Sequence, residues 1–174
     1  MMRTLLVVFL TGFTVLGANV KAIPLAVGAP APQISAIDQE GKPIQFADIY
    51  SKGITLVYFY PKADTPGCTA EACSLRDSYE NLHAKGLQII GVSRDNSGTQ
   101  KQCQDKYKLP FTLVADTDGK VAEAFGVPMM MKGIIPLASR QSFIVKDGKI
   151  AWISLKAQTK GSADEVQKAL DSLK

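Results

Sequence analysis

The stretch Tyr58–Asp77, YFYPKADTPGCTAEACSLRD, passes from an apolar, aromatic run into a helical pattern and carries a cysteine at the junction. Thr65 and Pro66 occupy the positions expected for the N-cap and the first residue of a helix, so Cys68 falls at the third helical position. The unpaired backbone N–H groups and the dipole of a helix N-terminus favour an anion, and therefore the thiolate form of this cysteine. Cys73 follows five residues later and offers an oxidised sulfur a partner thiol.

On both sides of this stretch the sequence alternates between strand and helix patterns. Strands are predicted at 54–60, 87–92, 111–115, 142–145 and 150–154, and the segments 33–38 and 43–46 are predicted to form an N-terminal hairpin. Helices are predicted at 66–85, 100–108, 121–125 and 163–173. The order β-α-β-α-β, followed by a hairpin and a closing helix, indicates an α/β fold with a mixed sheet.

Three further features concern helix ends and a loop. Gly86 is placed to end the long helix as its C′ glycine. Ser162 and Glu165 have the spacing of a capping box at the start of the last helix. Residues 128–139, PMMMKGIIPLAS, are predicted to be an irregular loop, and their apolar composition indicates that they pack over the body of the protein.

The N-terminal residues 1–22 have the pattern of a secretory signal peptide. Arg3 precedes the apolar run 5–16, and Val20-Lys21-Ala22 suits cleavage after Ala22. The sequence therefore predicts an exported, periplasmic protein with a single domain over residues 23–174. The alternative is an uncleaved anchor, although the apolar run is short for a membrane span.

Charge and cysteine content limit the possible partners. The chain of 174 residues has a net charge of +4, which becomes +2 once Arg3 and Lys21 are removed with the leader. Without a block of like charge, nothing indicates a nucleic-acid or anionic-membrane partner. Three cysteines, an odd number, do not make a disulfide-stapled scaffold, and one pair with one leftover thiol is the simplest accounting. An oxidising compartment would require a reductant to be supplied.

The order Pro61, Thr65, Cys68, Cys73 resembles the active-site motif of peroxiredoxins, and within them the atypical PrxQ or bacterioferritin-comigratory type. The similarity extends from about Val27 onward. Later matches lie at 91–93 with Asp95, at 106–111, at 121–127, and at Arg140 ahead of 143–145. This resemblance implies a thioredoxin-like fold with an N-terminal extension and an inserted helix.

The resemblance also implies roles for individual residues. Cys68 would be the peroxidatic nucleophile, and the Thr65 hydroxyl would bond its thiolate and the incoming peroxide. Arg140 would reach the thiolate from a later strand, favour its charged form and stabilise the negative charge that develops on oxygen. Cys73 would resolve the sulfenic acid as an intramolecular disulfide. Pro61, Pro66 and Gly67 would shape the substrate pocket.

The implied substrates are hydrogen peroxide or alkyl hydroperoxides, and the implied reductant is a thioredoxin-like dithiol protein. The resemblance implies no metal or organic cofactor, and relatives of this type are often monomers. Cys68 and Cys73 on one helix would have Cα atoms about 8–9 Å apart, whereas a disulfide needs roughly 7 Å or less. Resolution would therefore require the first turns of the helix to unwind.

Alternatives remain for the other residues and for the function. Cys103 is interpreted as a half-buried structural thiol, with a resolving or regulatory role as the alternative. His83 could complete a Cys3His zinc set by count, but the spacings do not favour a compact site. The alternative functions are an exported thioredoxin-like thiol–disulfide oxidoreductase or copper-handling protein, and a non-catalytic interaction domain. The sequence does not identify the preferred peroxide, the reductant or the oligomeric state.

Overall fold

The computed structural model describes residues 25–132 and 135–173, and its centre is a five-stranded mixed sheet in the order β5-β4-β3-β8-β9. Strands β3 (Ile54–Phe59), β4 (Leu87–Ser93) and β5 (Thr112–Ala115) are parallel. Strands β8 (Gln141–Lys146) and β9 (Lys149–Ser154) form a hairpin that joins antiparallel to β3. The α/β class and the mixed sheet predicted from the sequence are confirmed.

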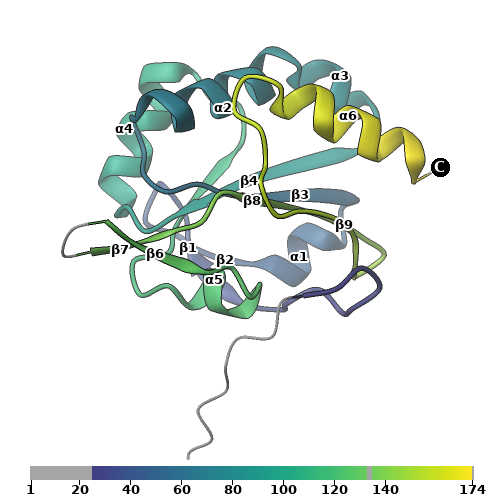
Figure 1. Ribbon diagram of the computed structural model, residues 1–174, viewed down its shortest axis with the longest axis horizontal. Helices are drawn as coiled ribbons and strands as arrows, with labels where there is room; N and C mark the ends of the chain where they lie inside the picture. The colour runs from purple at the N-terminus through teal and green to yellow at the C-terminus, as the bar shows by residue number, and fades with distance from the viewer. Residues whose placement is uncertain (1–24, 133–134, 174) are drawn as a thin grey trace, which may run out of the picture.

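Helices cover both faces of the sheet (Figure 1). One face carries α2 (Pro66–Asp77), α3 (Tyr79–Ala84), α4 (Ser97–Tyr107) and α6 (Ser162–Ser172), and the other carries the short helices α1 (Phe46–Tyr50) and α5 (Lys120–Ala124). Strand β3 is apolar at nearly every position because its side chains alternate between two cores. Leu56 and Tyr58 face the core beneath α2, whereas Val57 and Phe59 face the core beneath α1 and α5.

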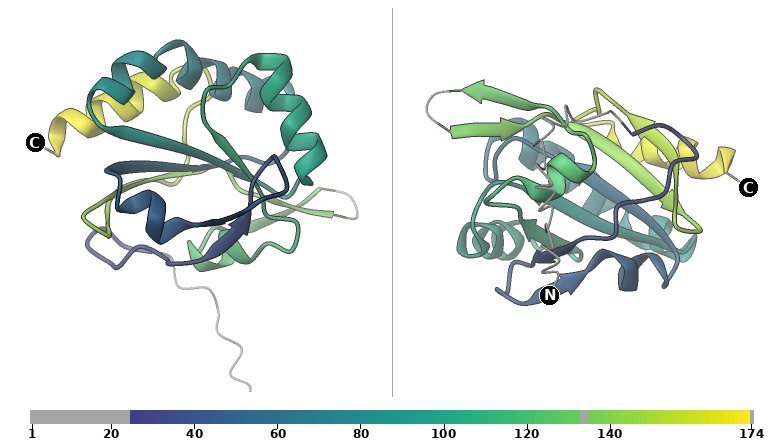
Figure 2. Two further views of the ribbon diagram at one scale, coloured as in Figure 1. Left: turned by 180° about the vertical axis from the view of Figure 1, so that it is seen from behind. Right: turned by 90° about the horizontal axis from the view of Figure 1, so that it is seen from below.

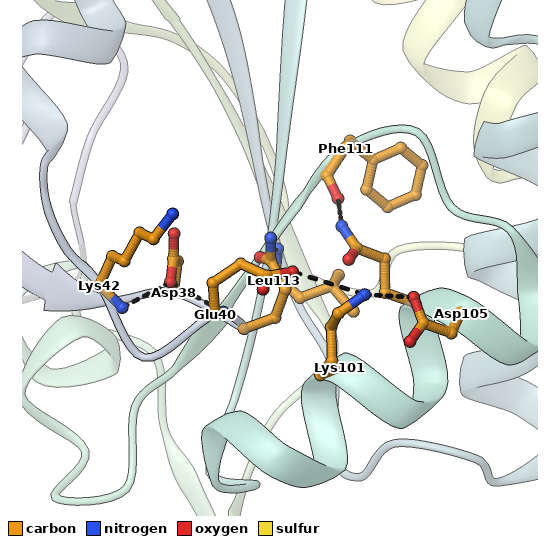
Figure 3. Close-up of polar contacts among 9 residues, drawn as sticks. Asp38, Glu40, Lys42, Lys101, Asp105, Phe111 and Leu113 are labelled. Atoms are coloured by element: carbon orange, nitrogen blue, oxygen red, sulfur yellow. Dashed lines mark hydrogen bonds and ion pairs between the residues drawn. The ribbon is translucent and has the colours of Figure 1, made fainter.

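The predicted N-terminal hairpin is present as β1 (Ser35–Ile37) and β2 (Pro43–Gln45), and its turn covers one edge of the sheet. Asp38 forms a β-bridge with Val114 of β5, and the Gln39 side chain accepts a hydrogen bond from the Leu113 N–H at 2.9 Å. The same turn contacts α4 through the Glu40–Lys101 ion pair at 3.5 Å (Figure 3).

The opposite edge of the sheet is partly covered by the segment that precedes this hairpin. The Gly28 N–H donates to the Ile150 carbonyl of β9, and the Ile150 N–H donates to the Ala29 carbonyl, each at 2.8 Å. An uncovered edge strand is a template for pairing with another chain. The N-terminal segment therefore shields both edges of the central sheet.

The helix predicted over 66–85 is interrupted, and this part of the prediction is wrong. Ser78 leaves the helical conformation with φ −103° and ψ 5°, so that α2 ends at Asp77 and α3 begins at Tyr79. Serine is a weak helix former because its hydroxyl competes for backbone hydrogen bonds. Gly86 follows with φ +81°, which confirms its predicted role as the C′ residue.

The predicted capping box is also wrong. Gly161 holds the N-cap position of α6, and Ser162 is the first helical residue. The Glu165 carboxylate does not turn back to the helix start, because it accepts hydrogen bonds from the Ser154 hydroxyl of β9 at 2.6 Å and from the Gln158 N–H at 3.1 Å. The carboxylate thus joins α6 to the sheet.

The segment predicted as an irregular loop, 128–139, instead contains β6 (Met129–Lys132) and β7 (Ile135–Ala138), which pair antiparallel. Figure 2 shows this hairpin extending away from the body of the protein. Its base packs as predicted, with Ala138 buried and Met129 against the core on the α1 side. The sequence also missed α1 and the first turn of α4, whose N-cap Asn96 accepts from the Thr99 N–H at 2.9 Å.

The predicted signal peptide, residues 1–22, lies outside the described residues. Within residues 25–132 and 135–173, no helix combines the length and the apolar character that a membrane span needs.

Candidate active site

Cys68 lies at the start of α2, where the sequence predicted it. Thr65 is the N-cap residue with φ −98° and ψ 151°, and Pro66 is the first helical residue. Cys68 is therefore the third residue of the helix, and it is 5% exposed. Its sulfur lies in the first turn, where the backbone N–H groups have no partner within the helix. Pro61 is half-buried just after β3, and Pro66 is exposed.

Arg140 is the residue that brings a positive charge to this thiol. Its Nη2 lies 3.2 Å from Cys68 Sγ. The two residues are far apart in sequence, and the pairing of β8 with β3 brings them together, since Gln141 stands opposite Phe59 at the end of β3. A guanidinium stays protonated and offers several donors in one plane, so it can contact the sulfur and a second group together.

The second group is Glu71, which sequence reasoning did not assign to the site. Its side chain is fully buried, and Oε2 accepts from Nη1 of Arg140. Burial raises the pKa of Glu71 to about 8, and the lowering effect of Arg140 only partly offsets this. Burial alone would lower the pKa of Arg140, but Glu71 and Cys68 raise it above its ordinary value.

Glu71 determines how much of the Arg140 charge is available to the sulfur. Burial favours the protonated carboxyl group, which accepts a hydrogen bond from Arg140 without cancelling the charge of the guanidinium. That charge is then available to the Cys68 thiolate. A glutamate three residues after Cys68 lies on the same helical face, and this spacing was the available signal in the sequence.

Gly67 and Thr159 lie beside the contact between Arg140 and Cys68. A Cβ atom added to Gly67 would lie 3.5 Å from Arg140 Nη2 and 3.6 Å from Thr159 Cγ2. A side chain at position 67 would therefore occupy space next to the guanidinium. Thr159 belongs to the connection between β9 and α6, and sequence reasoning did not identify it.

The hydrogen bond of the Thr65 hydroxyl goes to the preceding loop and not to the sulfur. The hydroxyl donates to the Lys62 carbonyl at 3.0 Å, and no side-chain capping bond is formed at this helix start. The N-cap position predicted for Thr65 is confirmed, whereas its side-chain hydrogen bond stays within the loop that precedes α2.

A buried hydrogen-bond network fixes this loop. The Ala63 N–H donates to Asp95 Oδ2 at 2.7 Å, and the Ser93 hydroxyl donates to the same oxygen at 2.7 Å. Gln100 of α4 donates to Ser93 Oγ at 2.9 Å and accepts from the Tyr60 hydroxyl. The Ala63–Asp95 bond attaches the loop before α2, and the bonds of Gln100 to Ser93 and Tyr60 join α4 to the sheet and to the start of this loop.

The other two cysteines lie at different depths. Cys73 is half-buried. It lies on α2 together with Cys68, so the two cysteines of the motif share one continuous helix as predicted. Cys103 is buried on α4 rather than half-buried, because it packs in the same core as Cys68. Burial raises the pKa of the Cys103 thiol. All three cysteines are free thiols.

The surroundings of His83 are aromatic. Its ring stacks on Tyr79 with centroids 5.3 Å apart. Across the part of the chain that the structure describes, no group of three or more His, Cys, Asp or Glu side chains is placed to hold a metal ion.

Comparisons with known proteins agree with this geometry. The family model of the AhpC/TSA family matches residues 27–153. Chloroplastic peroxiredoxin Q of Sedum lineare is 39% identical over 149 residues, covering 84% of this chain and 78% of that protein. Chloroplastic peroxiredoxin Q of Arabidopsis thaliana is 41% identical over 127 residues, covering 72% of this chain and 57% of that protein.

Solved structures show the same relationship. Peroxidoxin BcpB of Mycobacterium tuberculosis aligns with a TM-score of 0.80 at 28% identity, covering 86% of this chain and 99% of that one. Peroxiredoxin Q of Xanthomonas campestris aligns with a TM-score of 0.74 at 27% identity, covering 85% and 96%. The predicted thioredoxin-like fold is confirmed, and a peroxidase is favoured over a thiol–disulfide oxidoreductase or a copper-handling protein. The chain therefore belongs to the AhpC/TSA family, as a peroxiredoxin of the Q, or bacterioferritin-comigratory, type and a thiol-dependent peroxidase.

Proposed function

We propose that this protein reduces hydrogen peroxide and organic hydroperoxides with Cys68 as the nucleophile and Cys73 as the resolving thiol. The observation that supports it most directly is the contact of Arg140 Nη2 with Cys68 Sγ at 3.2 Å in the first turn of α2. A fixed cation and a helix N-terminus act together on this sulfur.

In the first step the Cys68 thiolate attacks one peroxide oxygen and breaks the O–O bond. The sulfur becomes sulfenic acid, and the other oxygen leaves as water or an alcohol after taking up a proton. Arg140 stabilises the negative charge that moves from sulfur to the leaving oxygen. The Thr65 hydroxyl is proposed to turn from the Lys62 carbonyl to the peroxide, since its loop position lies directly before the helix. Pro61, Pro66 and Gly67 border the approach.

In the second step the Cys73 sulfur attacks the sulfenic sulfur, a disulfide forms and water leaves. Both residues lie on α2, so the Cα separation of a regular helix, about 8–9 Å, exceeds what a disulfide allows. The first turns of α2 must therefore unwind. A thioredoxin-like dithiol protein then reduces the disulfide by thiol exchange.

Organic hydroperoxides are included because of a relative. The Xanthomonas campestris bacterioferritin comigratory protein, whose solved structure is 25% identical in sequence to this chain, is described as having alkyl peroxide reduction activity. For this chain we further propose export to the periplasm with cleavage after Ala22, a single domain over residues 23–174, and a monomeric state. Mass spectrometry of periplasmic material tests the export, since cleavage gives an N-terminus at Ile23 and retention gives one at Met1.

Peroxide consumption with a thioredoxin-like reductant is the direct test of the activity. Cys68→Ser should abolish turnover, because among the three cysteines Cys68 alone lies in the first turn of a helix. Cys73→Ser should keep the first oxidation step and then accumulate sulfenic and sulfinic acid. Peptide mapping of the oxidised wild type should find a Cys68–Cys73 bond. A Cys68–Cys103 bond would instead make Cys103 the resolving thiol.

A further inference from the structure

Tyr107, the last residue of α4, contacts both ends of α2. Its hydroxyl donates to Asp64, which lies two residues before the first residue of α2. Its backbone carbonyl accepts from Arg76 Nη1 at 2.7 Å, and Arg76 lies one residue before the end of α2. This carbonyl is one of those that a helix C-terminus leaves unpaired, so Arg76 also satisfies the end of α4.

Lys106 strengthens the contact at the N-terminal end of α2. Its Nζ lies 2.7 and 2.8 Å from the two carboxylate oxygens of Asp64. Asp64 adopts a left-handed conformation with φ +57°, which residues other than glycine rarely adopt. The hydrogen bonds that Lys106 donates to the Asp64 carboxylate lower the pKa of Asp64 and raise the pKa of Lys106. The backbone turn at Asp64 is thus held by two side chains of α4.

These contacts enclose the segment that has to change shape. Cys68 and Cys73 both lie between Asp64 and Arg76, and neither of them is bonded to Lys106 or Tyr107. Both ends of α2 are attached to α4. Unwinding of the helix between them therefore has to strain or break these contacts. Releasing one end removes that restraint.

We propose that Lys106 and Tyr107, through Asp64 and Arg76, form a clamp that keeps α2 helical and limits the rate at which the oxidised Cys68 is resolved. The proposal rests on the proposed Cys68–Cys73 disulfide for its functional consequence, but not for its structural one. In the sulfenic state two reactions compete. Either Cys73 displaces water and forms the disulfide, or a second peroxide transfers an oxygen to the sulfur and leaves sulfinic acid and an alcohol or water. A tighter clamp slows disulfide formation and therefore favours oxidation to sulfinic acid.

Two conservative variants release the clamp without removing packing. Asp64→Asn removes the charge that Lys106 contacts, and asparagine tolerates the left-handed conformation. Tyr107→Phe removes the hydroxyl but keeps the ring, which packs against the core. The matched control is Asp105→Asn, because the Lys101–Asp105 pair lies on the same helix and is also solvent-exposed (Figure 3). The other carboxylate partner of Lys101 is Glu40 of the N-terminal hairpin turn.

Hydrogen exchange of the reduced protein is the first readout. Asp64→Asn and Tyr107→Phe should each raise the exchange rate of amides in residues 67–74 by about two- to five-fold, the range expected for one exposed polar contact. The Asp105→Asn control should match the wild type. Unchanged exchange over residues 67–74 in both clamp variants would overturn the proposal.

The second readout is chemical. After one equivalent of peroxide, both clamp variants should form the disulfide about two- to five-fold faster than the wild type, matching the change in hydrogen exchange. At high peroxide they should yield less sulfinic acid than the wild type. In the double variant Asp64→Asn/Tyr107→Phe the effect should be no larger than the larger single effect, because the Tyr107 hydroxyl acts through the Asp64 carboxylate that Asp64→Asn removes. Strictly additive effects would show two independent surface contacts and would contradict a single clamp.

The two proposals can fail separately. If peptide mapping finds no Cys68–Cys73 bond, the proposed resolution is wrong, and exchange in the reduced protein still decides whether the clamp exists. If the bond forms but its rate and the exchange are the same in all variants, the clamp is wrong and the proposed function stands.

Discussion

The buried carboxyl group beneath Arg140 makes a prediction about stability and pH. The pKa of Glu71 rises from 4.5 to about 8 on folding, chiefly because of burial. A raised pKa in the folded state means that the folded protein holds a proton which the unfolded chain has released. This contribution to stability is complete below about pH 4.5 and is lost as the pH rises to about 8.

The magnitude follows from the size of the shift. Each pKa unit corresponds to about 1.4 kcal/mol, so the whole shift corresponds to about 5 kcal/mol of unfolding free energy lost across this window. The side chain is fully buried, so solvent screening gives no reason to reduce this figure. Glu71→Gln removes the titrating proton while keeping the size of the side chain and an oxygen that accepts from Arg140.

Urea unfolding at several pH values between 4.5 and 9 measures the effect. Both proteins should carry Cys68→Ser and be kept reduced, so that position 71 is the only titratable difference between them. Between pH 4.5 and 8 the unfolding free energy should fall more steeply with Glu71 than with the Glu71→Gln variant. If the two proteins lost unfolding free energy equally with pH, the raised pKa of Glu71 would be refuted. A stability that rises with pH, relative to Glu71→Gln, would show that Arg140 outweighs burial and keeps the carboxylate charged.

Three other variants test separate parts of the site and the sheet. Arg140→Ala should slow the oxidation of Cys68 by peroxide by about 10²-fold, the usual loss on removing one charge-stabilising donor, measured by stopped-flow kinetics. Thr65→Val should also slow this step while leaving α2 helical by circular dichroism, and an unchanged rate would limit the threonine to its N-cap position. Gly91→Ala should destabilise the fold by about 1–3 kcal/mol in urea, because the added Cβ would lie 2.7 Å from the Tyr58 hydroxyl oxygen.

Sequence patterns predicted the elements whose signals are local. The central strands, the N-terminal hairpin and the helix that begins at Pro66 all show up as periodicity and punctuation along the chain. The β6–β7 hairpin was missed because its two short apolar runs have no alternation to distinguish strands from loop. The break at Ser78 was missed because the apolar spacing continues through it into α3.

The candidate site was predictable where the sequence carries a motif and unpredictable where tertiary structure decides. Cys68 and Thr65 stand at a helix start that can be recognised by its residues alone. The role of Arg140 came from the family resemblance, because an isolated arginine before a strand has no local signal. Glu71 could not be assigned to the site, since its burial and its contact with Arg140 depend on the pairing of β8 with β3.

The covering of both sheet edges by the N-terminal segment has a consequence for the order in which the chain folds. Residues 28 and 29 pair with Ile150, so one of the earliest described segments waits for a strand that is synthesised near the end. Such non-local pairings are slow to form, because the entropy cost of closing the long loop comes before the contacts that stabilise it. As the chain emerges from its N-terminal end, the N-terminal segment remains without its partner until β9 has emerged. The edge of β5 can be covered early, whereas the edge at β9 is completed last, and a chain truncated before Lys149 would never complete it.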